Sequence, residues 1–98
     1  MIIVLGGIVA RSDSIDEALQ VSLEHVHRSR LEPGCLLHSV HRDVEDPLHL
    51  VFVENWVDRA ALDAHFAVPE SRGFVKALRG LAASATAMEI YEAERVTF

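Results

Sequence analysis

Apolar runs and helical periodicities alternate along this chain. Residues 2–9 are almost entirely aliphatic and are interrupted only by Gly6 and Gly7, a pattern typical of a strand that is buried on both faces. Residues 48–56 form a second such run. Residues 35–43 and 86–92 alternate more loosely between apolar and polar side chains, which predicts two further strands.

Helix signals lie between these strands. Ser14 and Glu17 form a Ser-x-x-Glu capping box, and apolar residues then recur at helical spacing until the chain reaches Glu32-Pro33-Gly34, which ends a helix. Asp58 is a good N-cap for a second helix. Pro69 suits the first turn of a third helix, because proline has no backbone N–H to leave unpaired there.

The predicted order is strand, helix, strand, strand, helix in two pieces, strand. This is the βαββαβ order of a ferredoxin-like α+β fold with an antiparallel sheet, and we expect one domain over residues 1–98. Both helical segments would cover the same face of the sheet. Since the strands at 2–9 and 48–56 are apolar on both faces, we expect a homodimer whose sheets pack against each other.

Composition excludes several classes of partner. The formal net charge is −6 and no lysine- or arginine-rich block occurs, which argues against nucleic acid and anionic membranes. Cys35 is the only cysteine, so no internal disulfide can form and a cytoplasmic location is expected. The apolar start of the chain lacks a positively charged leader and is too short to cross a bilayer.

Candidate chemistry gathers where the strand at 48–56 ends and the next helix begins. The strand end carries Glu54, Asn55 and Trp56, and the helix carries His65. A histidine has an ordinary pKa of about 6.5, so a neutral imidazole can accept a proton from a substrate near neutral pH. We therefore predict that His65 is a general base. The alternative is a histidine that lies on the helix surface or caps the strand end.

Trp56 and Asn55, at the end of the strand at 48–56, are alternative candidates for a direct contact with the substrate. Trp56 could form a flat wall against an aromatic ring, and Asn55 could donate to a developing oxyanion. Strand alternation places them on opposite faces, so both line one cavity only if the strand bulges or ends there. We favour Trp56. Glu54 shares its face and would orient a histidine or pair with an arginine.

Three further residues are candidate substrate contacts. His38 and Arg42 share one face of the strand at 35–43 and could contact a polar group of a ligand, or form a cross-strand ion pair with a glutamate. Tyr91, on the last strand, is a further possible wall or hydrogen-bond donor.

The six histidines raise the question of a metal site. His25 and His27 do not face the same way on a helix, and His38 and His41 fall on opposite faces of a strand. His41 and His49 could approach across a hairpin, but two ligands without a third do not make a convincing site. We therefore expect no metal.

Along nearly its whole length the chain resembles the antibiotic biosynthesis monooxygenase domain family. This resemblance implies ferredoxin-like subunits paired into a dimeric α+β barrel. It also implies oxygenation of quinols, anthrones or related phenols by molecular oxygen, without metal or flavin. The residues that carry it are Glu32-Pro33-Gly34-Cys35, Arg42-Asp43 with Asp46-Pro47, and Glu54-x-Trp56 followed by Ala61-Leu62-Asp63-Ala64-His65.

The chain departs from the family pattern in three places. Many members have Pro-His-Phe where this chain has Pro69-Glu70-Ser71, and a tyrosine is frequent where it has His38. The haem-degrading branch uses an asparagine on the first strand and a histidine on the last helix. This chain has Gly6 and Gly7 on the first strand and no histidine on the last helix, so haem degradation is not expected.

Two functions follow as hypotheses. The first is a cofactor-independent monooxygenase of a small phenolic, quinol or polyketide-like aromatic. The second is a non-catalytic dimeric module that binds a hydrophobic ligand or another protein. Glu70, in place of the family's frequent histidine, slightly favours the second.

Overall fold

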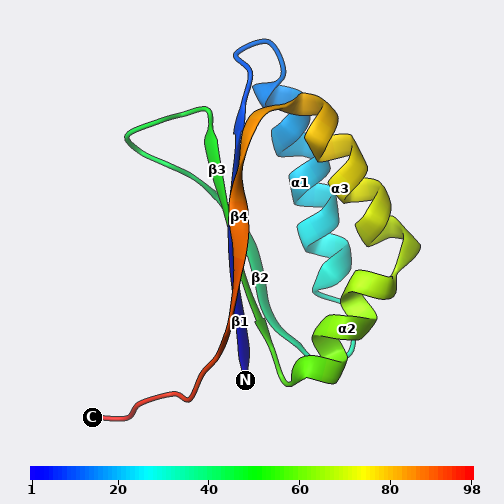
Figure 1. Cartoon of the computed structure of the whole chain (residues 1–98), viewed down its shortest axis with the longest axis vertical. Coiled ribbons are helices and arrows are strands. Elements are labelled where there is room, and N and C mark those ends of the chain that lie inside the picture. Colours follow the sequence, from blue (N-terminus) through cyan, green and yellow to red (C-terminus); the bar gives the residue numbers. More distant parts are fainter.

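The computed structural model describes residues 1–98 and has the predicted ferredoxin-like α+β arrangement (Figure 1). The four strands form one antiparallel sheet in the order β2-β3-β1-β4. None of the helices has the length and apolar composition needed to cross a membrane. The elements are β1 (Ile2–Ala10), α1 (Ile15–Ser29), β2 (Cys35–Arg42), β3 (His49–Trp56), α2 (Arg59–Ala67), α3 (Pro69–Leu81) and β4 (Ala82–Glu92).

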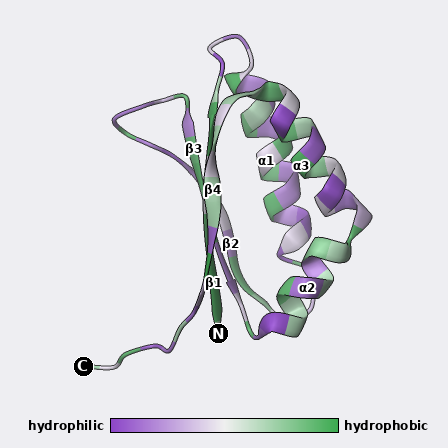
Figure 2. Cartoon of the chain, in the orientation of Figure 1, coloured by the Kyte–Doolittle hydropathy of each residue, from purple (hydrophilic) through white to green (hydrophobic).

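All three helices lie on one side of the sheet, and the other side is bare (Figure 1). Alternation along β1 follows this division, because Ile2, Val4 and Ile8 are buried while Leu5 is exposed. The bare face is apolar as well: Leu5, Leu37 and Tyr91 are each 37–48% exposed. Figure 2 shows this two-sided character as hydrophobic colouring along β1, whereas the helices carry hydrophilic and hydrophobic segments in turn.

The buried face of the sheet holds two apolar clusters with polar residues between them. Along β3, Leu50 and Phe52 belong to the first cluster and Trp56 to the second, and Glu54 stands between them on the same buried face. The first cluster contains Ile8, Ala10, Ala18, Leu50, Phe52 and Leu78. The second contains Ile2, Val4, Trp56 and Leu62.

Element boundaries agree with the sequence patterns except at the last strand. β4 begins at Ala82 rather than at Thr86. The prediction missed this start because the alanine- and serine-rich residues 82–85 have low intrinsic strand propensity. They pair with β1 nonetheless, with register shifts between Leu5 and Gly7 and between Val9 and Ala10.

The capping box at Ser14 was predicted in the right place but with the wrong hydrogen bonds. Ser14 is the N-cap residue of α1, yet its hydroxyl caps no helix N–H and instead donates to the Leu81 carbonyl at 2.6 Å. Arg11 Nη1 donates to the Gly80 carbonyl at 3.2 Å. Since α3 ends at Leu81 and β4 begins at the next residue, both bonds hold the α3–β4 junction against the turn that precedes α1.

Candidate functional site

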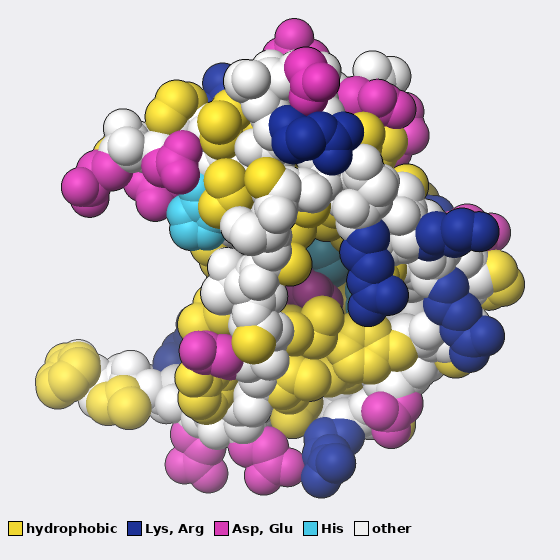
Figure 3. All heavy atoms as spheres, turned by 45° about the horizontal axis from the view of Figure 1, so that its top comes forward, with side chains coloured by type: hydrophobic (Ala, Val, Ile, Leu, Met, Phe, Trp, Pro, Cys, Tyr) yellow, Lys and Arg dark blue, Asp and Glu magenta, His cyan; other side chains and the backbone are white.

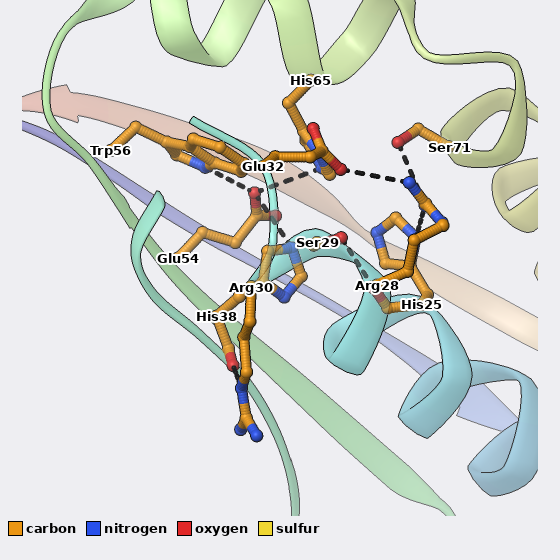
Figure 4. A network of polar contacts seen from close by, with 10 residues as sticks. All are labelled: His25, Arg28, Ser29, Arg30, Glu32, His38, Glu54, Trp56, His65 and Ser71. Atoms are coloured by element: carbon orange, nitrogen blue, oxygen red, sulfur yellow. Dashed lines mark hydrogen bonds and ion pairs between the residues drawn. The ribbon is translucent and has the colours of Figure 1, made fainter. Parts of the chain in front are cut away.

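Three histidines from three different elements meet beneath the helices (Figure 4). His25 comes from α1, His38 from β2 and His65 from α2, and each is 7% exposed or less. Their ring centroids lie 5.2–5.4 Å apart. Glu54, the polar residue between the two apolar clusters, completes the group.

Glu54 is the central carboxylate of this group. Its Oε1 atom accepts a hydrogen bond from Trp56 Nε1 at 2.9 Å and lies 3.4 Å from His38 Nε2 and 3.7 Å from His65 Nε2. Burial by itself would raise the pKa of Glu54, but His38, the Trp56 N–H and His65 together hold that pKa below its usual value. Glu54 is therefore an anion at neutral pH.

His65 is oriented by a second carboxylate. Its Nδ1 atom lies 2.9 Å and 3.1 Å from the two oxygens of Glu32, in the turn between α1 and β2, where Gly34 adopts a φ of 81°. A carboxylate only accepts, so Nδ1 carries a proton, and in the neutral form of this imidazole the lone pair is on Nε2. The helix that carries His65 is fixed at its start, because Asp58 accepts from the Ala61 N–H at 2.9 Å.

His25 is held between an arginine and an aromatic ring. Arg28 Nη2 donates to His25 Nδ1 at 2.7 Å, and the imidazole stacks on Phe74 with centroids 3.9 Å apart. Burial, with His38, His65 and Arg28 nearby, lowers the pKa of His25 to about 3. The same guanidinium donates to Glu32 Oε2 at 3.1 Å and to Ser71 Oγ at 3.3 Å.

His38 is the least supported member of the group. It is 1% exposed, and neither of its ring nitrogens makes a hydrogen bond to a protein atom. Its backbone carbonyl accepts from Arg30 Nε at 2.9 Å, which fixes the strand but not the ring.

The histidine group forms the floor of a hollow between the sheet and α3. One part, of about 340 Å³, reaches His25, His38 and Glu54, and a neighbouring part of about 430 Å³ reaches His25, Glu54 and His65. Volumes of this order with mostly apolar walls and a few polar groups are typical of small-molecule sites. Figure 3 shows the hollow, with histidine and acidic atoms deep inside it and basic atoms on its rim. Basic residues that line it are Arg72, Lys76 and Arg79 of α3.

Of the seven candidate residues from the sequence, the structure brings four together: His38, Glu54, Trp56 and His65. Trp56 is fully buried and does not line the hollow; its ring packs against His65 with centroids 4.5 Å apart. It therefore supports His65 and Glu54 from behind rather than forming a wall.

The other three candidates lie elsewhere. Asn55 pairs with Ile3 and Leu37 on the bare face of the sheet, as strand alternation requires once Trp56 points toward the helices. Tyr91 is on that bare face too, where its hydroxyl donates to Glu89. Arg42 is an exposed residue at the end of β2 and lines neither part of the hollow.

Sequence reasoning missed His25, Arg28 and Glu32. On α1 the apolar Leu23 is 45% exposed, whereas several small and polar residues face inward. The signal that could have found His25 is the spacing of the buried residues on that face: Ala18, Ser22, His25, Val26 and Ser29. His25 was compared only with His27, and no pattern along the chain places it near His38 or His65.

Comparisons with known proteins agree with this fold. A family model for antibiotic biosynthesis monooxygenases matches residues 1–77. The uncharacterised protein sll1783 of Synechocystis is 35% identical over 91 residues, which are 93% of this chain and 62% of that relative. The chain thus spans less than two thirds of the length of that curated relative.

Solved structures give the same result. The structure of a candidate antibiotic biosynthesis monooxygenase from Deinococcus radiodurans superposes on this chain with a TM-score of 0.93 and a sequence identity of 27%. The superposition includes 100% of this chain and 97% of the Deinococcus chain. Another antibiotic biosynthesis monooxygenase superposes with a TM-score of 0.84 at 31% identity and covers 99% and 100% of the two chains. Because the family model matches residues 1–77, which are most of this chain, the chain belongs to the antibiotic biosynthesis monooxygenase family.

Proposed function

We propose that the protein is a monooxygenase of a small, electron-rich aromatic such as a phenol or quinol, and that it needs no organic cofactor. The observation that carries this proposal is the orientation of His65: Glu32 accepts a hydrogen bond from Nδ1–H, so in the neutral imidazole the lone pair belongs to Nε2, at the floor of the hollow. A neutral imidazole in this position can accept the phenolic proton of a bound substrate.

Deprotonation provides the electrons for the reaction. When the O–H bond breaks, its proton goes to His65 Nε2 and the phenolate transfers one electron to molecular oxygen, which gives a phenoxyl radical and superoxide. Their recombination forms a carbon–oxygen bond and, after the proton returns, a hydroperoxide. Loss of water then leaves a quinone, so that one oxygen atom enters the product and the other leaves as water. The substrate supplies all four electrons.

Other features of the hollow suit such a substrate. Phe74 and Phe52 line it and offer aromatic surface, and the basic rim residues Arg72, Lys76 and Arg79 favour a phenolate or an acidic substituent. His38 supplies a polar contact on the opposite side from α3. These features support the phenol or quinol class without selecting one compound.

We further propose that the working form is a cytoplasmic homodimer. The bare face of the sheet exposes Leu5, Leu37 and Tyr91, and a second sheet packed against it would remove these apolar surfaces from water. Asn55 and Tyr91 would then lie in the dimer interface rather than at the substrate, because both are on that face.

Oxygen consumption tests the proposal. Purified protein should consume oxygen with at least one member of a panel of hydroquinones and anthrones, with no added cofactor, and His65→Ala should lose that activity. His27→Ala is the matched control, because His27 is exposed on the outer side of α1. Turnover that His65→Ala leaves unchanged would contradict the base assignment. Ligands that raise the melting temperature without any oxygen uptake would favour the non-catalytic binding module.

A further inference from the structure

We propose that His25, His38 and His65 form a binding site for one divalent transition-metal ion. Each of the three side chains offers a nitrogen atom, and these atoms all lie within 4.8 Å of one another. Three imidazoles on a common metal at about 2.0–2.1 Å each would have nitrogens about 3.4 Å apart in tetrahedral geometry. Small rotations of the three rings therefore suffice to close the site. The expectation of no metal, drawn from pairs of histidines along the chain, did not consider this set.

The poorly satisfied ring of His38 is the second observation that points to a ligand. Buried polar groups without a hydrogen-bond partner are costly and rare in native proteins. His38 is 1% exposed and makes no hydrogen bond; its nearest polar group is Glu54 Oε1, in an ion-pair contact 3.4 Å from Nε2. A metal ion among the three rings would give this buried imidazole a stronger partner.

His65 already has the surroundings of a metal-bound histidine. Histidine ligands usually donate their other ring N–H to a carboxylate, which fixes the tautomer and the ring orientation. Glu32 accepts from His65 Nδ1 at 2.9 Å, so Nε2 is directed inward, 3.7 Å from Glu54. Glu54 is the adjacent anion that offsets the charge of a cation held by three neutral imidazoles.

His25 is the ligand that must change most. Arg28 Nη2 donates to its Nδ1 at 2.7 Å, so its proton resides on Nε2. Binding through Nε2 of a neutral imidazole moves that proton to Nδ1, which then donates and can no longer accept from Arg28, so Arg28 turns away. Arg28 keeps two partners in that event, Glu32 at 3.1 Å and Ser71 at 3.3 Å. Metal binding and the Arg28–His25 contact are therefore alternatives.

The donor set indicates which ions bind. Imidazole nitrogen suits Zn²⁺, Co²⁺, Ni²⁺ and Cu²⁺, whereas Mg²⁺ and Ca²⁺ require several oxygen ligands. The hollow reaches the three histidines from one side, so a coordination position remains open to a small molecule.

Titration with Co²⁺ tests the site in the absence of any substrate, so its result does not depend on the proposed oxygenation. Wild-type protein should bind one Co²⁺ per chain with visible d–d absorption, which Zn²⁺ displaces and Mg²⁺ does not. His38→Gln and His25→Gln should each weaken binding at least tenfold. His27→Gln and His49→Gln are matched controls and should bind as wild type, since neither residue belongs to the cluster.

A second measurement uses wild-type protein, so that the proposal can still be tested if the histidine variants do not fold. X-ray absorption of Zn²⁺-loaded wild type should show three imidazole nitrogens. The proposal would be overturned by wild-type protein that binds no Co²⁺, by folded His38→Gln protein that binds as tightly as wild type, or by fewer than three imidazoles on the zinc.

Discussion

Nδ1 of His65 lies 2.9 Å from Oε1 of Glu32, although 33 residues separate them along the chain. The contact joins α2 to the turn that follows α1. It fixes which nitrogen of the imidazole carries the proton, and both proposed roles of His65 depend on that. A base needs the free lone pair of Nε2, and so does a metal ligand.

Replacing Glu32 by glutamine tests this orientation. Glu32→Gln removes the negative charge that stabilises the protonated imidazole, so we expect kcat for phenol oxidation to fall about 10- to 100-fold with little change in KM. Glu24→Gln, an exposed site on α1, is the control. Steady-state oxygen uptake measures both constants, and equal kcat values for Glu32→Gln and wild type would show that Glu32 does not position the base.

A bound metal should inhibit the proposed reaction. Metal binding at the three histidines and proton transfer to His65 use the same lone pair of Nε2. We expect Zn²⁺ at saturating concentration to reduce oxygen uptake at least tenfold, and a chelator to restore it. The measurement is turnover against free metal concentration. Turnover that increases with the metal would mean that His65 acts as a ligand and not as the base.

Two adjacent glycines of β1 should respond differently to substitution. A Cβ at Gly6 meets nothing within 4 Å and would enter the hollow, whereas a Cβ at Gly7 would lie 2.7 Å from the Leu50 carbonyl oxygen. Gly6→Val should therefore raise KM about tenfold with an unchanged melting temperature. Gly7→Ala should destabilise the fold by about 1–3 kcal/mol. Thermal unfolding measures the stability of both variants, and steady-state kinetics measure their KM. A lower melting temperature for Gly6→Val would mean that this part of the hollow is filled by other side chains.

The bare face of the sheet should control assembly. Leu5 faces that side between Val53 of β3 and Glu89 of β4, so Leu5→Glu would place a second carboxylate beside Glu89 within the proposed interface. We expect this variant to elute as a monomer at concentrations where wild type is a dimer. Val44→Glu is the control, because Val44 is 99% exposed in the β2–β3 turn. Light scattering gives the masses, and a wild-type monomer at micromolar concentration would contradict the dimer.

The Trp56–Glu54 hydrogen bond should contribute to stability. Trp56→Phe keeps a large ring in the apolar cluster but removes the N–H that donates to Glu54 Oε1 at 2.9 Å. We expect a loss of about 1–3 kcal/mol in the free energy of unfolding, since a buried carboxylate loses a donor. Denaturant unfolding of Trp56→Phe, Glu54→Gln and the double variant forms a cycle that isolates the pair. Additive losses would show that the bond contributes nothing.

Much of the fold followed from local patterns. The apolar runs of β1 and β3, the Asp58 cap and Pro69 placed most element boundaries to within a residue, because each is a short-range signal. The start of β4 did not follow from them, because Ala82 and Ser84 are strand residues only through their pairing with β1. Ser14 likewise bonds to Leu81, a partner distant along the chain, rather than to its own helix.

The site was accessible from the sequence only in part. Glu54, Trp56 and His65 were found because they lie close together along the chain at a strand end and the following helix. His25 and Glu32 join them through the packing of α1 against the sheet, and α1 buries polar residues that an apolar periodicity does not identify. The convergence of three histidines is a tertiary property that comparing neighbours in sequence does not reveal.

The direct passage from α3 into β4 has a consequence for how ligands enter. Both elements line the hollow. Ser14 and Arg11 donate hydrogen bonds to the carbonyls of Leu81 and Gly80, at the junction between α3 and β4. That end cannot move apart without losing both bonds, whereas one side-chain hydrogen bond, from Arg28 to Ser71 Oγ, ties the start of α3 to α1. We therefore expect α3 to pivot about its C-terminal end, so that ligand binding displaces Arg72 more than Arg79.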